Sequence, residues 1–211
     1  MKLAEIIWRA KSFINFGKGG TVHRFTQRYS RIKLKTECLL DKDEESWKLK
    51  LHIGCGCIYL KDYVNIDISG HLASDYPDLV EQNSTTIDDY YAGLDGDMNH
   101  LPKPVETVAD VLCDFTKLPY EPSSVDKIVA IQTLEHVTPG VGRNAIMHFW
   151  NILKPGGVLI ISVPDTLGTI QLLKSWETFQ FGIRHLEGSL KNQYSNHVSW
   201  YSTDSLIEIL Q

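Results

Sequence analysis

Short apolar runs separated by helical patterns make up the sequence from residue 47 onward. Five runs have the length and composition of strands, and the last is almost wholly apolar, as expected for a strand buried on both faces of a parallel sheet. They span residues 49–53, 63–68, 109–113, 127–131 and 157–163. Between the fourth and fifth runs, apolar residues recur at helical spacing over residues 142–153, and Lys-Pro-Gly-Gly follows. We therefore predict an α/β fold with an open, mostly parallel sheet and right-handed crossovers.

Residues 1–40 differ from the rest of the chain in both pattern and charge. Apolar residues recur at helical spacing over 3–14 and again over 22–32, where Arg and Lys are interleaved with them. Nine basic and two acidic residues give this segment a charge of +7, while residues 41–211 carry −12 of the total −5. We predict a basic amphipathic helical extension over 1–40 and one domain over 41–211. The extension is expected to pack on protein, with contact of residues 1–35 with an anionic membrane as the alternative.

Composition narrows the class of protein further. The 211 residues are 43% hydrophobic and 22% charged, which is typical of one soluble globular domain. No apolar run approaches the ~20 residues of a membrane span, and charged residues interrupt the first fifteen positions, so we expect a cytoplasmic protein. The four cysteines lack zinc-site spacing and are expected to be reduced thiols. The chain shows no compact run of His and carboxylate residues, so no metal is expected.

Chemistry in an open parallel sheet is expected where each strand ends, because ligands bind beyond the carboxyl ends. Gly54 and Gly56 follow the first predicted strand and allow the backbone to approach a ligand closely. Asp67 ends the second, where a carboxylate accepts hydrogen bonds from ribose hydroxyls; capping of the next helix is the alternative. Asp114 and Phe115 follow the third and could hold the edge and face of an adenine. Together these residues predict a nucleoside site.

Two common nucleotide motifs do not fit these residues. A dinucleotide fingerprint needs a third glycine three residues after the second, where this chain has Tyr59, and an acidic residue about 20 positions on. Asp67 comes only 13 residues after Gly54. No Gly-Lys-Ser/Thr follows the loop, which also excludes a P-loop. The pattern favours a nucleoside without a pyrophosphate.

Six motifs in this order resemble those of class I S-adenosylmethionine-dependent methyltransferases. They are LHIGCG at 51–56, NIDI at 65–68, CDFTKLP at 113–119, SVDKI at 124–128, LEH at 134–136 and LKPGG at 153–157. The resemblance implies a Rossmann-like methyltransferase fold with S-adenosyl-L-methionine as cofactor. The chain departs from many members in having His52 in place of an acidic residue and Cys57 in place of a third glycine.

The resemblance also implies where the cofactor binds. The implied contacts are Gly54, Cys55 and Gly56 at the methionine part, Asp67 and Ile68 at the ribose, Asp114 and Phe115 at the adenine, and Gln132 beside the transferred methyl group. His136 and His197 are the candidate catalytic residues, because a hydroxyl acceptor benefits from a base that titrates near neutral pH. The alternatives are that His136 shapes the cleft and that His197 is packed between aromatic residues.

The acceptor is less well defined by the sequence than the donor. Residues 184–188 and 195–201 faintly resemble the acceptor region of methyltransferases that act on sugars and surface polysaccharides. We expect O-methylation of a sugar, a glycan or another small polar metabolite, and we do not favour a nucleic acid. The alternative is a catalytically silent cofactor-binding module that residues 1–40 tether to a membrane or nucleic acid. The long connection at 69–108 is expected to form a wall or rim of the acceptor site.

The last part of the sequence predicts how the sheet is completed. Residues 203–211 have the pattern of a single helix, so we expect the sheet to lack the C-terminal antiparallel hairpin that is usual in the resembled fold. The fifth strand would then have an unpaired edge, which proteins ordinarily cover. We predict that residues 1–40 or a second copy in a homodimer covers it.

Overall fold

The computed structural model describes residues 13–16, 21–28, 31–38, 47–90, 106–190 and 192–209, with residues 13–38 described in their backbone alone. Its strands are β1 (Phe13–Phe16), β2 (Thr21–Arg28), β3 (Arg31–Cys38), β4 (Lys50–Ile53), β5 (Tyr59–Leu60), β6 (Val64–Asp67), β7 (His71–Leu72), β8 (Ser84–Thr85), β9 (Val108–Ala109), β10 (Val111–Leu112), β11 (Val125–Ile131) and β12 (Leu153–Pro164). Its helices are α1 (Pro77–Asn83), the 3-10 turns η3 (Phe115–Lys117) and η4 (Leu134–His136), α3 (Pro139–Ile152), α4 (Thr166–Leu172), α5 (Trp176–Glu187) and α6 (Thr203–Ile209).

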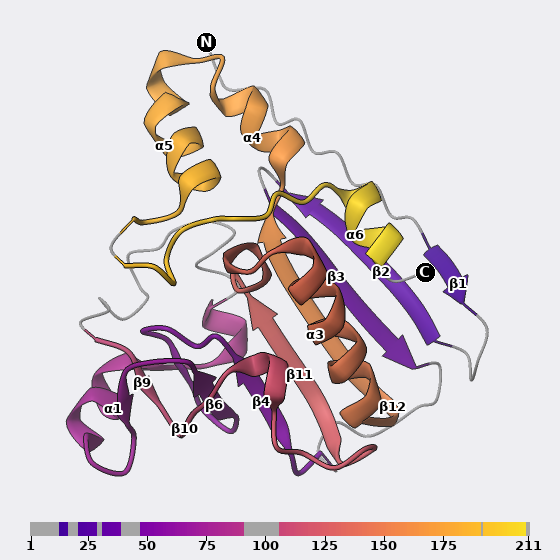
Figure 1. The fold of residues 1–211 in the computed structure, drawn as a ribbon, viewed down its shortest axis with the longest axis vertical. Helices are drawn as coiled ribbons and strands as arrows, with labels where there is room; N and C mark the ends of the chain where they lie inside the picture. The colour runs from indigo at the N-terminus through magenta and orange to yellow at the C-terminus, as the bar shows by residue number, and fades with distance from the viewer. Residues whose placement is uncertain are drawn as a thin grey trace.

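One large sheet organises the domain, in the order β1-β2-β3-β12-β11-β4-β6-β10 (Figure 1). The five strands from β12 to β10 run parallel, which confirms the predicted Rossmann-like sheet. The chain builds outward from β4 in one direction through β6 and β10, then returns to β4's other side with β11 and β12. The order therefore reverses between β4 and β11. Ligands bind at such a reversal in open α/β sheets.

The centre of the sheet is buried on both faces, which explains the nearly all-apolar sequence at the end of β12. Alternate residues of β11 and β12 point to opposite sides. On one side they pack against α3 and α6, with Phe149 and Leu206 fully buried (Figure 1). On the other side they pack against residues 58–63 and 87–90, where Leu60 is fully buried. The site at the carboxyl ends therefore rests on strands that are held from both sides.

The helical extension predicted for residues 1–40 is wrong where the structure describes it. Residues 13–16, 21–28 and 31–38 are strands, and β2 and β3 form an antiparallel hairpin. The sequence of residues 31–38, RIKLKTEC, alternates apolar or small residues with charged ones, which is the period of a strand. The residues predicted as a helix at 3–12 lie outside the described part of the chain.

The hairpin covers the edge of the last parallel strand. β3 pairs with β12 in antiparallel register from Leu159↔Thr36 to Pro164↔Arg31. The prediction that residues 1–40 cover this edge is therefore confirmed, although they do so as strands. An apolar edge strand offers a full set of unpaired backbone groups to any neighbouring extended segment, and this is the physical reason for the strand conformation. A homodimer stays a prediction.

Two further segments refine the predicted elements. The third predicted strand is divided into β9 and β10 at Asp110, whose carboxylate accepts hydrogen bonds from the Asn65 backbone (2.7 Å) and the Tyr59 hydroxyl (2.6 Å). The connection after β6 contains β7, α1 and β8, and β7 pairs with β9. Residues 91–105 of this connection lie outside the described part, so its place at the acceptor site stays a prediction.

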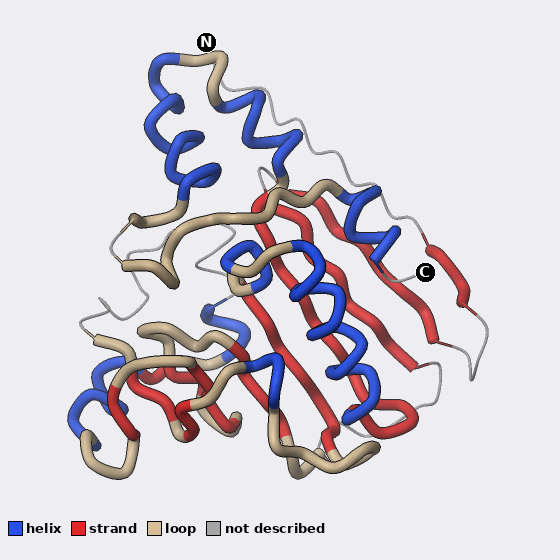
Figure 2. Tube along the Cα trace, in the orientation of Figure 1, coloured by secondary structure: helices blue, strands red, loops and turns tan. Residues whose placement is uncertain are grey.

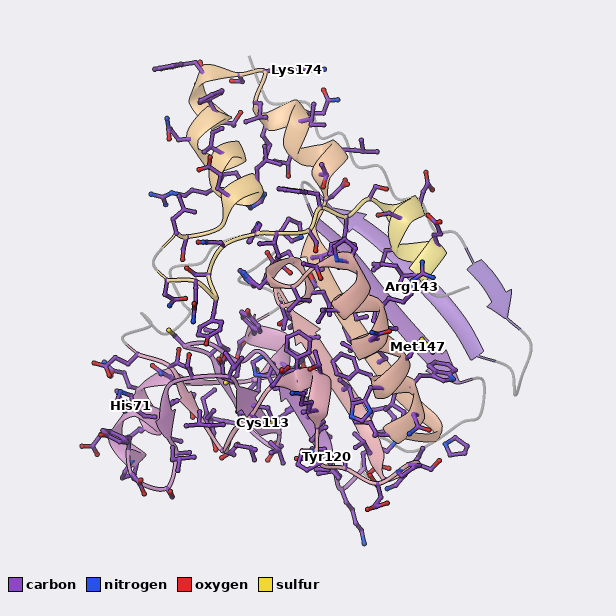
Figure 3. The ribbon with its side chains drawn as sticks, viewed as in Figure 1. His71, Cys113, Tyr120, Arg143, Met147 and Lys174 are labelled. Atoms are coloured by element: carbon purple, nitrogen blue, oxygen red, sulfur yellow. The ribbon has the colours of Figure 1, made fainter. Side chains whose placement is uncertain are left out.

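The segment after β12 forms a pair of helices and a return loop. α4 and α5 pack against each other and project beyond the sheet, with Lys174 at the connection between them (Figures 1 and 3). The loop from 188 to 202 then crosses back over the ends of the strands to α6 (Figure 2). Among the described residues, no helix combines the length and the apolar character that a membrane span requires.

Candidate active site

The turn after β4 lies at the point where the strand order reverses. Gly54 and Gly56 both have positive φ, 63° and 54°, which glycine adopts without steric cost. A Cβ on Gly54 would lie 2.4 Å from Cγ2 of Thr133, whose hydroxyl donates to the Ile53 carbonyl (2.9 Å). A Cβ on Gly56 would meet nothing within 4 Å. Gly54 is therefore needed for packing between β4 and β11, while Gly56 borders open space where a ligand can approach.

The carboxylate of Asp67 is held beside this turn. Its Oδ2 accepts a hydrogen bond from the Gly56 backbone N–H (2.8 Å), and its Oδ1 accepts from those of Ile68 (2.8 Å) and Ser69 (3.3 Å). The chain continues into β7, so Asp67 caps no helix. Oδ2 keeps a further lone pair that can accept from a ribose hydroxyl. Ile68, which is 44% exposed, presents an apolar side chain next to it.

Cys55 lies between the two glycines but faces the core. It is 3% exposed, and its Sγ donates to the Val108 carbonyl at 3.5 Å. Burial raises the pKa of the thiol well above its ordinary value, and the negative charges of Asp67 and Asp110 act in the same direction. Cys55 can therefore contribute only backbone groups to a ligand.

Asp114 and Phe115 begin the η3 turn after β10. Asp114 Oδ1 accepts from the backbone N–H (2.9 Å) and the hydroxyl (2.7 Å) of Thr116. Burial works against ionisation, but these two hydrogen bonds and the nearby Lys117 charge prevail and lower the pKa of Asp114. Phe115 packs at the margin of the core, with its ring centroid 6.2 Å from that of Phe149. The carboxylate is thus ionised and oriented, and the ring beside it is fixed.

Gln132 follows β11 directly and is strained. Its φ is 53°, in the left-handed region that residues with a Cβ rarely adopt. Its backbone N–H donates to the Ser162 carbonyl at 2.7 Å, and its Nε2 donates to the same oxygen at 3.5 Å. Such strain is concentrated at functional sites, where the surroundings hold it in place. The position is consistent with the predicted role beside the transferred methyl group, which stays a prediction.

The structure brings His136 and His197 together although they are far apart in the sequence. Their ring centroids are 4.9 Å apart. His136 Nδ1 lies 3.0 Å from the Asn196 carbonyl, and His197 Nδ1 lies 2.8 Å from the His185 carbonyl. A carbonyl oxygen only accepts, so each Nδ1 carries the proton. In a neutral ring the lone pair is then on Nε2.

Burial lowers the pKa of both imidazoles below the ordinary histidine value. For His136 the Asn196 carbonyl and the charge of Asp67 oppose this, but burial prevails. For His197 the His185 carbonyl opposes it, and the neighbouring His136 lowers the pKa further. Both rings are neutral near pH 7. The influence of Asp67 on His136 also links the histidine pair electrostatically to the predicted ribose carboxylate.

Glu135 completes a cluster that sequence reasoning missed. It is 1% exposed, and its Oε1 lies 4.0 Å from His197 Nε2. One ligand atom each from Glu135, His136 and His197 can be chosen so that all three lie within 4.8 Å of one another. The statement that no compact cluster of His and carboxylate is present is therefore wrong for the folded chain. The sequence signal that could have indicated this cluster is the adjacent Glu-His pair that follows the fourth predicted strand.

Backbone hydrogen bonds hold the two halves of this cluster together. The Glu135 carbonyl accepts from the N–H groups of Val198 (2.8 Å) and Ser199 (3.1 Å), and the Ser199 hydroxyl donates to the Val137 carbonyl. The loop that carries His197 is thereby fastened to η4. This long-range contact between residues 135 and 197 is the one that the sequence could not indicate.

His52, the chief departure from the resembled motif, lies inside the protein. It is 1% exposed, and its Nδ1 donates to Oδ1 of Asn65 at 3.0 Å. Burial lowers its pKa to about 4, only partly offset by this hydrogen bond. Its side chain packs edge-on against Tyr90, with ring centroids 6.2 Å apart. His52 is thus a neutral core residue.

Comparisons with known proteins give the family of this chain. The model of a family described as a methyltransferase domain matches residues 51–161, more than half of the chain. Among solved structures, the chain is similar to an S-adenosylmethionine-dependent methyltransferase from Methanosarcina mazei, with 20% identity, 76% of each chain covered and a TM-score of 0.42. A search of curated proteins found no significant match.

Proposed function

Because the chain belongs to the methyltransferase domain family and is an S-adenosylmethionine-dependent methyltransferase, we propose that it methylates a hydroxyl oxygen of a sugar, a glycan or another small polar metabolite. The observation that carries the proposal is the pair of adjacent imidazoles, His136 and His197, which donate from Nδ1 and so have their lone pairs on Nε2. A hydroxyl acceptor gains most from such a group, because its proton must be removed as the oxygen attacks.

The residues after the strands fit the cofactor. Gly56 borders open space at positive φ, where a β-carbon would otherwise project. Asp67 would accept from the ribose hydroxyls, with Ile68 exposed beside it, and Asp114 would accept from the adenine amino group through the oxygen that Thr116 does not use. When bound, S-adenosyl-L-methionine supplies an electrophilic methyl group, and its sulfur retains the electron pair of the broken C–S bond.

The chain's own residues then orient the acceptor and take up its proton. Gln132 and Thr133, fixed by bonds to Ser162 and Ile53, form the floor at the end of β11. When no other ligand occupies Nε2 of His136, the hydroxyl proton passes to that nitrogen. The Asn196 carbonyl accepts the hydrogen bond from Nδ1–H and so stabilises the resulting imidazolium. The bound acceptor itself excludes water from the site, which favours this proton transfer.

An oriented aromatic ring supports a sugar as acceptor. Trp200 is 59% exposed, and its Nε1 donates to the Leu186 carbonyl at 3.1 Å. The preceding carbonyl, that of His185, accepts from His197 Nδ1. Trp200 and His197 are thus anchored on consecutive carbonyl groups at the end of α5. The apolar face of a pyranose ring stacks well on an indole, so a sugar on Trp200 would lie near the histidine pair.

The experiment tests donor binding and acceptor class separately. Isothermal titration with S-adenosylmethionine and S-adenosylhomocysteine compares the wild type with Asp67→Ala and with the exposed control Asp75→Ala. We expect Asp67→Ala to lose at least about tenfold in affinity, since a hydrogen bond to a charged group contributes about 1.5–3 kcal/mol. Equal affinities in all three proteins would contradict the ribose assignment.

Turnover is then measured on matched acceptors. A panel of methyl glycosides and nucleotide sugars is compared with the corresponding amino sugars blocked at every hydroxyl. We expect methylation of free hydroxyls and a fall in kcat of about 10²-fold or more for His136→Gln. Methylation of the amines alone, or an unchanged kcat in His136→Gln, would refute the proposal. Cofactor binding without turnover on any acceptor would favour the silent module.

A further inference from the structure

Three side chains at the end of β11 present electron-pair donors to a common point. The ligand atoms of Glu135, His136 and His197 lie within 4.8 Å of one another, and Glu135 Oε1 is 4.0 Å from His197 Nε2. Ligand atoms of a tetrahedral ion with bonds of about 2.1 Å lie about 3.4 Å apart. Binding of an ion therefore requires these side chains to close by up to about 1.4 Å.

The hydrogen bonds around the cluster are those of metal-binding histidines. His136 Nδ1 donates to the Asn196 carbonyl and His197 Nδ1 donates to the His185 carbonyl. Such bonds fix the tautomer and ring orientation, and they leave Nε2 as the coordinating atom. Both acceptors are backbone oxygens of segments that other backbone bonds hold in place, including the bond from His197 N–H to the Glu187 carbonyl at 3.0 Å. The nitrogen donors are thus preorganised.

The charge and burial of the cluster favour a cation. The Glu135 side chain is 1% exposed and the His197 side chain is 9% exposed. Within this cluster, one carboxylate and two imidazoles each present an atom of a kind that binds metal ions. A divalent ion between these atoms would place positive charge beside the buried carboxylate.

We infer that Glu135, His136 and His197 bind one divalent cation of the first transition series. Two imidazoles and one carboxylate suit Mn²⁺, Fe²⁺, Co²⁺ or Zn²⁺ better than Ca²⁺ or Mg²⁺, which prefer oxygen ligands alone. Three protein ligands leave coordination positions open for oxygens of a second molecule. The site would therefore hold an acceptor as well as the ion.

The catalytic role of this cation rests on the proposed O-methylation, whereas its binding does not. An acceptor hydroxyl that coordinates the ion would have a lowered pKa and would release its proton to water as it binds, before the site closes. Its oxygen then forms the new bond to the methyl carbon, and the electrons of the broken C–S bond stay on sulfur. With the ion bound, the imidazoles hold the metal, so His136 no longer needs to act as the base.

Titration with Co²⁺ tests the site directly. The full-length chain is stripped with EDTA, dialysed and titrated with CoCl₂ alone, while visible d–d absorption and heat of binding are recorded. We expect one Co²⁺ per chain, displaced by Zn²⁺. His197→Gln and His136→Gln should each weaken binding at least about tenfold. The control His71→Gln removes another histidine beside a carboxylate, Glu106, at the periphery next to α1 (Figure 3), and should bind as the wild type does.

The outcomes separate this inference from the proposed function. Absence of one-to-one binding, equal affinity in all variants, or a thiolate-to-Co²⁺ charge-transfer band that assigns the ion to cysteines would overturn the site. If Glu135→Gln fails to fold, the His136→Gln variant still decides, because that side chain is only half-buried. Full hydroxyl methylation in EDTA would remove the catalytic role and leave the proposed function standing. Co²⁺ binding by a chain that methylates no hydroxyl would do the reverse.

Discussion

Lowering the pH should reduce the free energy of unfolding of this domain through His52, at pH values where protonation of an exposed histidine has little effect on stability. The imidazole is 1% exposed, and burial lowers its pKa from the ordinary 6.5 to about 4. Between these two pKa values His52 binds a proton in the unfolded chain but not in the folded chain, so the free energy of unfolding rises with pH. The contribution of His52 is fully present above pH 6.5 and is lost progressively as the pH falls towards 4.

The magnitude follows from the two pKa values. Each pH unit between them corresponds to about 1.4 kcal/mol, so the complete loss is about 3 kcal/mol. Between pH 7 and pH 4.5 the loss is about 2.5 kcal/mol. A domain with a free energy of unfolding of about 5–15 kcal/mol would lose a substantial part of it.

Urea unfolding of the wild type and of His52→Leu at pH 7 and pH 4.5 measures this effect. Leucine has a similar size, and Asn65 Oδ1 keeps its hydrogen bond from the Leu60 backbone (2.8 Å) when the imidazole is removed. We expect the fall in unfolding free energy between the two pH values to be about 2.5 kcal/mol smaller in His52→Leu than in the wild type. Equal pH dependence in the wild type and His52→Leu would refute the reasoning.

Three further substitutions test the turn after β4 and the ion pair between β11 and β12. Gly54→Ala should lower the free energy of unfolding by more than about 2 kcal/mol, because its Cβ would meet Thr133 at 2.4 Å and φ is positive. Gly56→Ala should lower the free energy of unfolding by about 1 kcal/mol. It should also weaken S-adenosylhomocysteine binding at least about tenfold. Thermal unfolding and titration calorimetry distinguish the two, and a reversed order of stabilities would contradict the packing argument. Lys154→Met should cost about 1–3 kcal/mol in urea unfolding at pH 7, because it removes the ammonium 2.8 Å from the mostly buried carboxylate of Asp126. Burial opposes ionisation of Asp126, but Lys154 and backbone N–H groups prevail and lower its pKa. The loss of stability in Lys154→Met should therefore shrink as the pH falls below 3.8. A loss that does not depend on pH would count against the ion pair.

The parallel sheet and the cofactor side of the site were predictable because their information is local. The central strands are short and mostly apolar, since both of their faces are buried, and residues with distinct chemical properties lie at or just after their ends. Gly56, Asp67 and Asp114 lie directly after β4, at the end of β6 and after β10, as predicted. The parallel arrangement then brings them to one edge of the sheet.

The amino-terminal segment was predicted wrongly because its local pattern is ambiguous. Apolar residues at 22, 25, 29 and 32 fit a helix, while residues 31–38 also alternate as a strand does. The edge of β12 decides between the two, since β3 supplies its missing hydrogen-bond partner. A strand more than a hundred residues away in the sequence thus determines the conformation of this segment, and the sequence of the segment alone does not show it.

Local sequence was sufficient to predict a class I methyltransferase sheet, the turn after its first parallel strand and the side chains at the ends of its strands, because burial and turn geometry act over a few neighbouring residues. The folded chain alone decided that His136, Glu135 and His197 meet, that Cys55 turns into the core and that His52 is kept from water. Each of these depends on contacts between segments distant in the sequence. Such contacts are selected by packing and hydrogen bonding of the whole domain, and they leave no periodic pattern in the residues that make them.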